Sequence, residues 1–278
     1  MPAPEHDPIV EQHRDGATAP VVELRGVAKA YGHVQALRDA CLSAYPGQVT
    51  ALVGDNGAGK STAIKVLAGA VQPDAGELLL DGRPVRLSSP QDARQHGIET
   101  VYQDLALAMD LDPAANIFLG RERLKGGLLG RLGFLDDAAM ARESERRLEE
   151  LGIRLTQPRK TVELLSGGQR QAIAIARAVS WSSKLLILDE PTAALGVRQT
   201  ELVFELIRAV AARGVAVIVI LHNFPHVFAI ADHIAVLRQG ETVAQRCRAE
   251  TTMDEVVRLT TGLEALAAAG AGGERDGE

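Results

Sequence analysis

Short apolar runs that stop abruptly at glycine or polar residues are the main pattern in this chain, and they predict the strands of a sheet. Four such runs span residues 49–53, 98–102, 184–190 and 215–221. The last two hold so few polar residues that they are typical of strands buried on both faces in an α/β fold. Each run is followed by side chains capable of chemistry.

The rest of the pattern adds flanking strands and helices. An edge strand is predicted at residues 21–24, and further strands at 42–45, 77–80 and 234–237, the last before a hairpin turn at 238–241. Residues 105–165 have a helical pattern in which Glu143 and Arg147 form an i,i+4 pair and Gly152 stops a helix. The many charges in this stretch are most simply a solvated face. An alanine-dense helix follows at 170–179.

Length and composition exclude several classes of protein. The chain has 278 residues, 46% of them hydrophobic, which suits one large domain or a domain with a subdomain. Its net charge of −6 argues against binding nucleic-acid backbone, although a local basic patch stays possible. No apolar run reaches the roughly 20 residues that cross a bilayer, so a soluble protein is expected. The proline-rich segment 1–20 and the segment 263–278 are expected to be disordered tails.

The two cysteines, Cys41 and Cys247, lie far apart in the sequence, and neither has a metal-binding spacing around it. A disulfide framework or a zinc site is therefore not expected, and a reducing compartment fits. Both cysteines are predicted to be small core residues.

A glycine-rich loop follows the first buried run and opens a helix. It is the Walker A pattern, with every defined position filled by Gly54, Asp55, Asn56, Gly57, Ala58, Gly59, Lys60, Ser61 and Thr62. Its glycines allow backbone N–H groups to surround a phosphate, the lysine supplies a charge, and the hydroxyl of Ser61 is placed to ligate Mg²⁺. A glycine turn before a surface lysine is the alternative.

Polar residues at three other strand ends fit the same chemistry. Asp189 could hold Mg²⁺, and Glu190 could act as a general base, although two acids here could instead cap a helix. His222 could donate a hydrogen bond to a γ-phosphate or the attacking water, but a lone histidine is more often a satisfied core residue. Gln103 could ligate Mg²⁺ or hold a water, and by itself it is a weak signal.

Two further motifs, taken singly, predict a function less clearly. Tyr31, in a predicted polar loop beside Gly32, could stack on a purine or simply pack. The sequence Leu165-Ser-Gly-Gly-Gln opens the helix at 170–179, and its free amides and hydroxyl could bind an anion or merely cap the helix. The motif residues of that second site are Ser166, Gly167, Gly168 and Gln169.

Taken together, the motifs resemble the ATP-binding subunit of an ATP-binding cassette (ABC) transporter over roughly residues 21–261. The resemblance implies that Tyr31 is the adenine-stacking residue, Gln103 the Q-loop glutamine, and the Leu165 motif the signature that binds ATP held by another subunit. It implies an α/β fold with a RecA-like P-loop NTPase core at 21–104 and 180–262, an antiparallel β edge, and an inserted helical subdomain at 105–179. It also implies that Glu190 is the catalytic glutamate and His222 the switch histidine.

Within that family, the segments at 103–107, 116–122 and 190–196 are similar to the bacterial ribose, xylose and fructose import group. The resemblance implies ATP and Mg²⁺ as cofactors, a head-to-tail homodimer, permease subunits, an indirect link to a periplasmic sugar-binding protein, and no nucleic acid. The location implied is the cytoplasmic face of the bacterial inner membrane. One departure is Gly196, which stands where the D-loop usually has aspartate.

Other functions remain open at this point. A soluble ABC ATPase of translation or DNA repair is one, although translation factors of this type usually carry two cassettes in one chain and repair proteins carry long coiled-coil insertions. An ABC ATPase for a non-sugar substrate is another. A nucleotide-binding module without catalysis is a third, which the presence of Glu190 and His222 disfavours.

Overall fold

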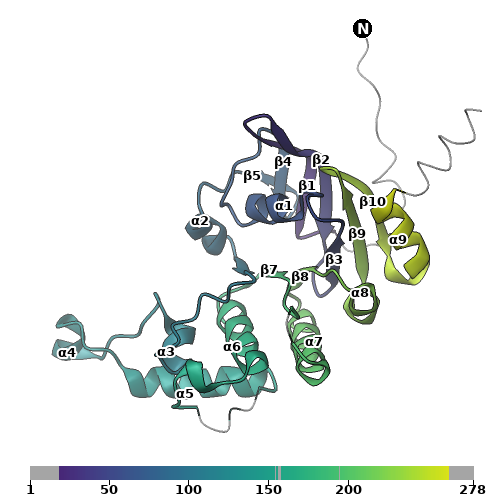
Figure 1. Ribbon diagram of the computed structural model, residues 1–278. Coiled ribbons are helices and arrows are strands. Elements are labelled where there is room, and N and C mark those ends of the chain that lie inside the picture. The colour runs from purple at the N-terminus through teal and green to yellow at the C-terminus, as the bar shows by residue number, and fades with distance from the viewer. Residues whose placement is uncertain (1–18, 154, 156–157, 194, 263–278) are drawn as a thin grey trace, which may run out of the picture.

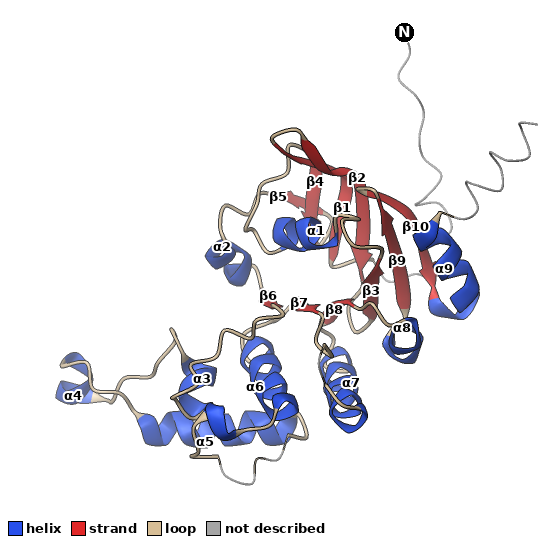
Figure 2. Ribbon diagram, viewed as in Figure 1, coloured by secondary structure: helices blue, strands red, loops and turns tan. Residues whose placement is uncertain are grey.

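A mixed sheet runs through the protein, as Figures 1 and 2 show for the computed structural model. In the described residues this sheet has ten strands. The structure describes residues 19–153, 155, 158–193 and 195–262. The strand order is β5-β4-β1-β2-β10-β9-β3-β8-β7-β6. The predicted tails at 1–20 and 263–278 fall almost wholly outside the described residues.

Half of the sheet is parallel. The order β9-β3-β8-β7-β6 is joined by parallel pairs throughout, and its strands are β3 (Val49–Val53), β6 (Ile98–Val101), β7 (Leu185–Asp189), β8 (Ala216–Ile220) and β9 (His233–Arg238). All four apolar runs predicted as strands are confirmed, within one residue at their ends.

The other half is largely antiparallel, and all its strands except β10 come from the first part of the chain. Its strands are β1 (Val22–Tyr31), β2 (Val34–Ala44), β4 (Ala75–Leu80), β5 (Arg83–Val85) and β10 (Glu241–Cys247). The prediction of an edge strand at 21–24 is wrong, because β1 pairs with β2 on one side and β4 on the other. Both β1 and β2 extend well beyond the predicted residues, since their outer ends are exposed and lack an apolar pattern.

Alternate residues of the parallel strands enter two separate cores. Leu186 and Leu188 of β7 join the core beneath α6 and α7, whereas Leu185 and Ile187 join the core beneath α1. Both faces of the strand are therefore covered, which explains why its sequence is a continuous apolar run. The helices around the sheet are α1 (Lys60–Leu67), α2 (Pro90–Gln95), α7 (Val197–Ala211), α8 (Phe224–Ile230) and α9 (Met253–Thr261).

A helical subdomain projects from the sheet between β6 and β7 (Figure 1). Its helices are α3 (Pro113–Phe118), α4 (Gly127–Arg131), α5 (Asp137–Glu150) and α6 (Gly167–Val179), with a 3₁₀ turn at Val162–Leu164. The predicted ion pair is confirmed, with 2.8 Å between Arg147 Nε and Glu143 Oε1. Helix α5 ends before Gly152, as predicted. No helix in the described part of the chain is long and apolar enough to cross a membrane.

Both cysteines are free thiols, and neither belongs to the core. Cys41 and Cys247 are partly exposed on β2 and β10, so the prediction of small core residues is wrong. Both strands have partly exposed positions, and the sequence around each cysteine does not indicate that exposure.

Asn116 is the polar centre of the helical subdomain. Its side chain is fully buried, its Oδ1 accepts from the N–H of Ala108 at 2.8 Å, and its Nδ2 donates to the carbonyls of Ala108 and Asp112 at 2.9 and 3.0 Å. One carboxamide thus fastens the segment that follows β6 onto α3.

We expect Asn116→Ala to lower the free energy of unfolding by about 1–3 kcal/mol, because it leaves buried backbone groups without partners. Urea denaturation followed by circular dichroism measures this loss. Gln91→Ala, which removes an exposed carboxamide from α2, is the matched control and should change stability little. Equal stability of the two variants would contradict the role given to Asn116.

Candidate active site

The parallel strands bring the predicted chemical residues to one edge of the sheet. Strands β3, β8, β7 and β6 are neighbours in that order and all run in the same direction. The chain therefore leaves all four at the same edge, where α/β folds bind ligands. That edge receives the glycine loop after β3, His222 after β8, Asp189 and Glu190 at the end of β7, and Gln103 after β6.

The glycine loop is shaped by close contact with the strand next to β3. Gly54 has φ +153°, and a Cβ built there would lie 2.1 Å from the carbonyl oxygen of Leu237 in β9. Gly59 has φ +106°, and its Cβ would lie 2.5 Å from the carbonyl oxygen of Ala36 in β2. Only glycine fits at these two points, so the loop depends on them for its shape.

The loop presents polar groups outward and buries its apolar side chain. Ala58 is buried and its carbonyl accepts from the N–H of Gly240, which fixes the middle of the loop. The exposed residues are Asp55, Asn56, Gly57 and Ser61, and Thr62 is partly exposed at the first turn of α1. The free amides of that turn and the positive end of the helix make a site for an anion.

Lys60 is buried at the base of this loop. Its side chain is folded back, and Nζ donates to the carbonyls of Gly54 at 2.6 Å and Asp55 at 2.9 Å. Burial lowers the pKa of Lys60 below its usual value, and the negative charges of Glu190, Asp55 and Asp189 partly offset this. A buried cation facing three carboxylates is held where an anionic ligand would relieve its desolvation.

Glu190 and His222 touch each other across the ends of β7 and β8. The distance from His222 Nε2 to Glu190 Oε1 is 2.7 Å. Glu190 has φ +50°, a conformation unusual for a side-chain-bearing residue, and its N–H donates to the carbonyl of Ile220 at 3.2 Å. Such backbone strain is common where a side chain must be aimed for function. Both side chains remain partly exposed, so they can reach a ligand.

Oxygen donors suited to a hard cation also lie at this edge. Asp189 is half-buried at the end of β7, Ser61 is exposed in the first turn of α1, and Gln103 is exposed after β6. Burial, followed by the charge of Glu190, raises the pKa of Asp189, whereas His222 and Lys60 oppose the rise. Carboxylate, hydroxyl and amide oxygens are ligands of the kind that Mg²⁺ takes in proteins. The described residues contain no group of three or more His, Cys, Asp or Glu that could hold a metal ion.

Tyr31 lies at the end of a strand rather than in a loop. It is the last residue of β1, it pairs with Val34 across a hairpin turn, and 45% of its surface is exposed. Lys29 Nζ lies 5.9 Å from its ring centroid and also donates to Asp74 at 2.6 Å. The prediction of a polar loop here is wrong, but Tyr31 is exposed, as stacking on a ligand would require.

The second glycine motif forms a complete helix cap. Ser166 is the N-cap of α6: its Oγ accepts from the N–H of Gln169 at 3.3 Å, and Gln169 Oε1 accepts from the N–H of Ser166 at 3.0 Å. The motif therefore caps α6, and its binding of an anion stays a prediction. Ser166 is nonetheless exposed, and the N–H groups of Gly167 and Gly168 stand at the positive end of a thirteen-residue helix.

Gln199 is a neighbour of this motif that the sequence reasoning missed. Its Oε1 accepts from the N–H of Gly196 at 2.8 Å at the start of α7. A Cβ on Gly168 would lie 2.8 Å from Gln199 Cγ, so this glycine allows the two helix starts to meet. The spacing of Gly196 and Gln199, which is that of a capping box, was the available signal. Ala194, in the segment predicted as the D-loop, lies outside the described residues.

Comparison with known proteins decides the family. Residues 37–193 match the family model of the ABC transporter, over more than half of the chain. The chain is also 48% identical to the fructose import ATP-binding protein FrcA of Rhizobium meliloti, with 89% of this chain and 96% of that protein covered. The chain belongs to the ABC transporter family. It is an ATP-binding cassette that hydrolyses ATP, and the predicted α/β P-loop fold is confirmed.

Two other relatives differ in how much of them the cassette covers. It is 44% identical to the xylose/arabinose import ATP-binding protein XylG of Sulfolobus acidocaldarius, over 87% of the cassette and 94% of that protein. It is 41% identical to the ribose import ATP-binding protein RbsA 2 of Escherichia coli O157:H7, over 88% of the cassette but 47% of that protein. The cassette thus spans about half the length of the ribose relative and nearly all of the other two.

Solved structures share the fold at lower identity. A nucleotide-free ATP-binding cassette from an ABC transporter has a TM-score of 0.74 at 22% identity and covers 86% of this chain and 98% of its own. A dimeric cassette in a post-hydrolysis state bound to ADP and phosphate has a TM-score of 0.68 at 24% identity, covering 82% and 98%. At these identities the likeness establishes the fold.

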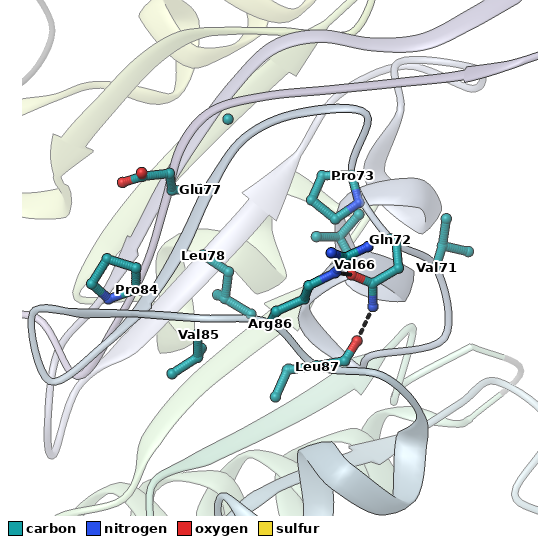
Figure 3. Close-up of a pocket in the computed structure, with 11 residues that line it drawn as sticks. Val66, Val71, Gln72, Pro73, Glu77, Leu78, Pro84, Val85, Arg86 and Leu87 are labelled. Carbon is teal, nitrogen blue, oxygen red and sulfur yellow. Dashed lines mark hydrogen bonds between the residues drawn. The ribbon is translucent and has the colours of Figure 1, made fainter.

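A separate hollow of about 310 Å³ lies between the end of α1 and strands β4 and β5 (Figure 3). Its walls are largely apolar, including Val66 and Leu78. The carboxamide of Gln72 is occupied at both ends, because it accepts from Arg86 at 3.1 Å and donates to the carbonyl of Leu87. This carboxamide is thus paired within the protein, and the hollow is assigned no role.

We expect Asp189→Asn to raise the melting temperature of the nucleotide-free cassette at pH 7–8. The folded-state pKa of Asp189 is raised, so its charged form destabilises the fold above that pKa, and this penalty vanishes below the unfolded value of about 4. The gain should therefore shrink as the pH falls toward 4. Scanning calorimetry from pH 4 to 8 measures it, with Asp110→Asn in an exposed loop as control. A lower melting temperature for Asp189→Asn at pH 8 would contradict the assignment.

Proposed function

We propose that this cassette binds Mg²⁺–ATP, works as a head-to-tail dimer, and powers the import of a monosaccharide through membrane permease subunits. The observation that carries the proposal is the 48% and 44% identity to fructose and xylose/arabinose import proteins over nearly the full length of both chains. A periplasmic sugar-binding protein would deliver the sugar, and the cytoplasmic face of the inner membrane would be the place of work.

The nucleotide would lie along the glycine loop. Tyr31 would stack on the adenine, and the loop from Gly54 to Thr62 would surround the phosphates with its N–H groups. Ser61, Asp189 and Gln103 would hold Mg²⁺, which when bound supplies positive charge to the phosphate oxygens. The ammonium of Lys60, now held by two carbonyl oxygens, would turn to the β- and γ-phosphates.

Hydrolysis requires a positioned water and a base. Glu190 is aimed by its left-handed backbone and held by His222, so its carboxylate would accept the proton of the attacking water. His222 would donate a hydrogen bond to the γ-phosphate while keeping Glu190 in place. The negative charge that develops on the phosphate would be spread over Lys60 and the loop amides.

Ser166 to Gln169 would complete the site of a second copy. In the same chain this motif starts α6 in the helical subdomain, on the other side of the sheet from α1 (Figure 1). Its exposed N–H groups would bind the γ-phosphate held by the partner, so ATP would join the two copies and hydrolysis would loosen them. Gly196 leaves this contact without the usual aspartate.

Hydrogen bonds link the helix that this motif begins to the segment after Gln103. Arg177, near the end of α6, donates to the carbonyl oxygens of Leu105 and Ala106, both at 2.8 Å. Next to it lies a cavity of about 280 Å³ between the sheet and the helical subdomain, lined in part by Glu99 and Arg121. We place the permease contact at this cavity, because movement of α6 would reach it through Arg177.

Glu190→Gln should bind ATP with unchanged affinity but hydrolyse it about 10²–10⁴-fold more slowly, since the amide cannot accept the proton of water. It should also accumulate as an ATP-dependent dimer. Phosphate release and size-exclusion chromatography with and without ATP measure the two effects. Glu205→Gln, which alters an exposed carboxylate of α7, is the control. Near-normal turnover by Glu190→Gln would remove that residue from the catalytic role.

Uptake of labelled fructose, xylose and ribose by cells that lack the gene tests the transport proposal. We expect uptake of one of these sugars to fall, and to recover with the wild-type gene but not with the Glu190→Gln gene. Co-purification with a membrane permease should accompany recovery. Unchanged uptake of all three sugars, together with an active ATPase that copurifies with no permease, would favour a non-transport ATPase instead.

A further inference from the structure

A hairpin-like excursion between α3 and α5 exposes an unusual number of large apolar side chains. We call residues 123–135, which include α4, the apolar finger. Figure 1 places α4 at the outermost tip of the helical subdomain, away from the sheet. The exposed side chains, between 39% and 71% accessible, are Leu124, Leu128, Leu129, Leu132, Phe134 and Leu135.

The finger is closed by its own backbone hydrogen bonds. The N–H of Lys125 donates to the carbonyl of Phe134 at 2.9 Å, and the N–H of Asp136 donates to the carbonyl of Arg123 at 2.7 Å. At the tip, Gly130 allows a tight approach, because a Cβ there would lie 1.8 Å from the carbonyl oxygen of Lys125. The apolar side chains are therefore displayed by a defined turn.

The base of the finger is fixed to the helical subdomain. The N–H of Arg123 lies 3.4 Å from Met140 Sδ of α5, and its guanidinium lies 5.5 Å from the ring centroid of Phe118 in α3. Asp136, just after the finger, caps α5 by accepting from the N–H of Ala139 at 3.0 Å. The finger thus moves with α3 and α5.

Charge sets the finger apart from the rest of the chain. It carries Arg123, Lys125 and Arg131 and no acidic residue, whereas the whole chain has a net charge of −6. All three basic residues are exposed. A segment with exposed leucines, several cations and no carboxylates matches an apolar layer covered by negative head groups.

We propose that the apolar finger anchors this subunit to an anionic lipid surface. The exposed apolar side chains lie on both arms, at Leu124 and Leu135, and at the tip, at Leu128 and Leu132. The basic residues among them favour a lipid surface over an apolar groove in a protein, because anionic head groups attract cations. Lys125 and Arg131 bind the head groups, and the leucines enter the acyl boundary.

Sedimentation of the full-length protein with vesicles tests this proposal. The protein should bind anionic vesicles made of mixed phosphatidylglycerol and phosphatidylcholine. Its binding to neutral vesicles of phosphatidylcholine alone should be at least about tenfold weaker. The double variant Leu128→Glu/Leu132→Glu should weaken binding to the anionic vesicles by at least about tenfold. Lys125→Gln/Arg131→Gln should also weaken it and reduce its sensitivity to salt, because fewer charges remain to be screened.

Two controls separate the finger from general effects. Leu202→Glu introduces one negative charge, half the charge of the double variant, at a side chain of α7 that is 63% exposed, and it should bind vesicles like the wild type. ATP hydrolysis by all the variants should match the wild type, since none touches the site at the sheet edge. A finger variant that binds vesicles as well as the wild type overturns the proposal, and its failure to copurify with the permease would identify the finger as a protein contact.

Discussion

Parallel hydrogen bonding among β3, β8, β7 and β6 is the constraint on which the site depends. Ile220 pairs with Leu52 on one side and with Asp189 on the other, and Val101 pairs with Leu188. This register brings the glycine loop, His222, Glu190 and Gln103 to one level from segments far apart in sequence. A slip of one residue in the pairing would move every side chain of a strand from one core to the other. The packing of both cores opposes such a slip.

The parallel strands, and the polar residues that follow them at one edge of the sheet, were predictable, because strands buried on both faces give a continuous apolar run that ends at those residues. The antiparallel half was not, since β1 and β2 are half-exposed and their pairing contains register shifts after Leu24 and Val27 that break alternation. Tyr31 was assigned to a loop for this reason. The leucines of residues 123–135 fit a helical pattern in sequence, and only tertiary structure shows that they have no core to enter.

The candidate site holds ionisable side chains where burial disfavours their charged forms. Burial lowers the pKa of Lys60 and raises that of Asp189, so each is pushed toward its neutral form in the same small region. Glu190 adds a backbone conformation that favours glycine. These features lower the stability of the fold, and they are compensated by the apolar strands on which the residues stand. A ligand with complementary charge therefore binds to side chains that are already positioned for it.

The link from Arg177 to Leu105 and Ala106 has a consequence for how such a subunit changes partners. Both acceptors are main-chain carbonyl oxygens, which every amino acid supplies. Side chains at Leu105 and Ala106 can consequently be replaced without loss of the hydrogen bonds from Arg177 of α6. If the permease binds where we propose, surface substitutions would adapt such a cassette to a different membrane protein and leave the hydrogen bonds between this segment and α6 unchanged.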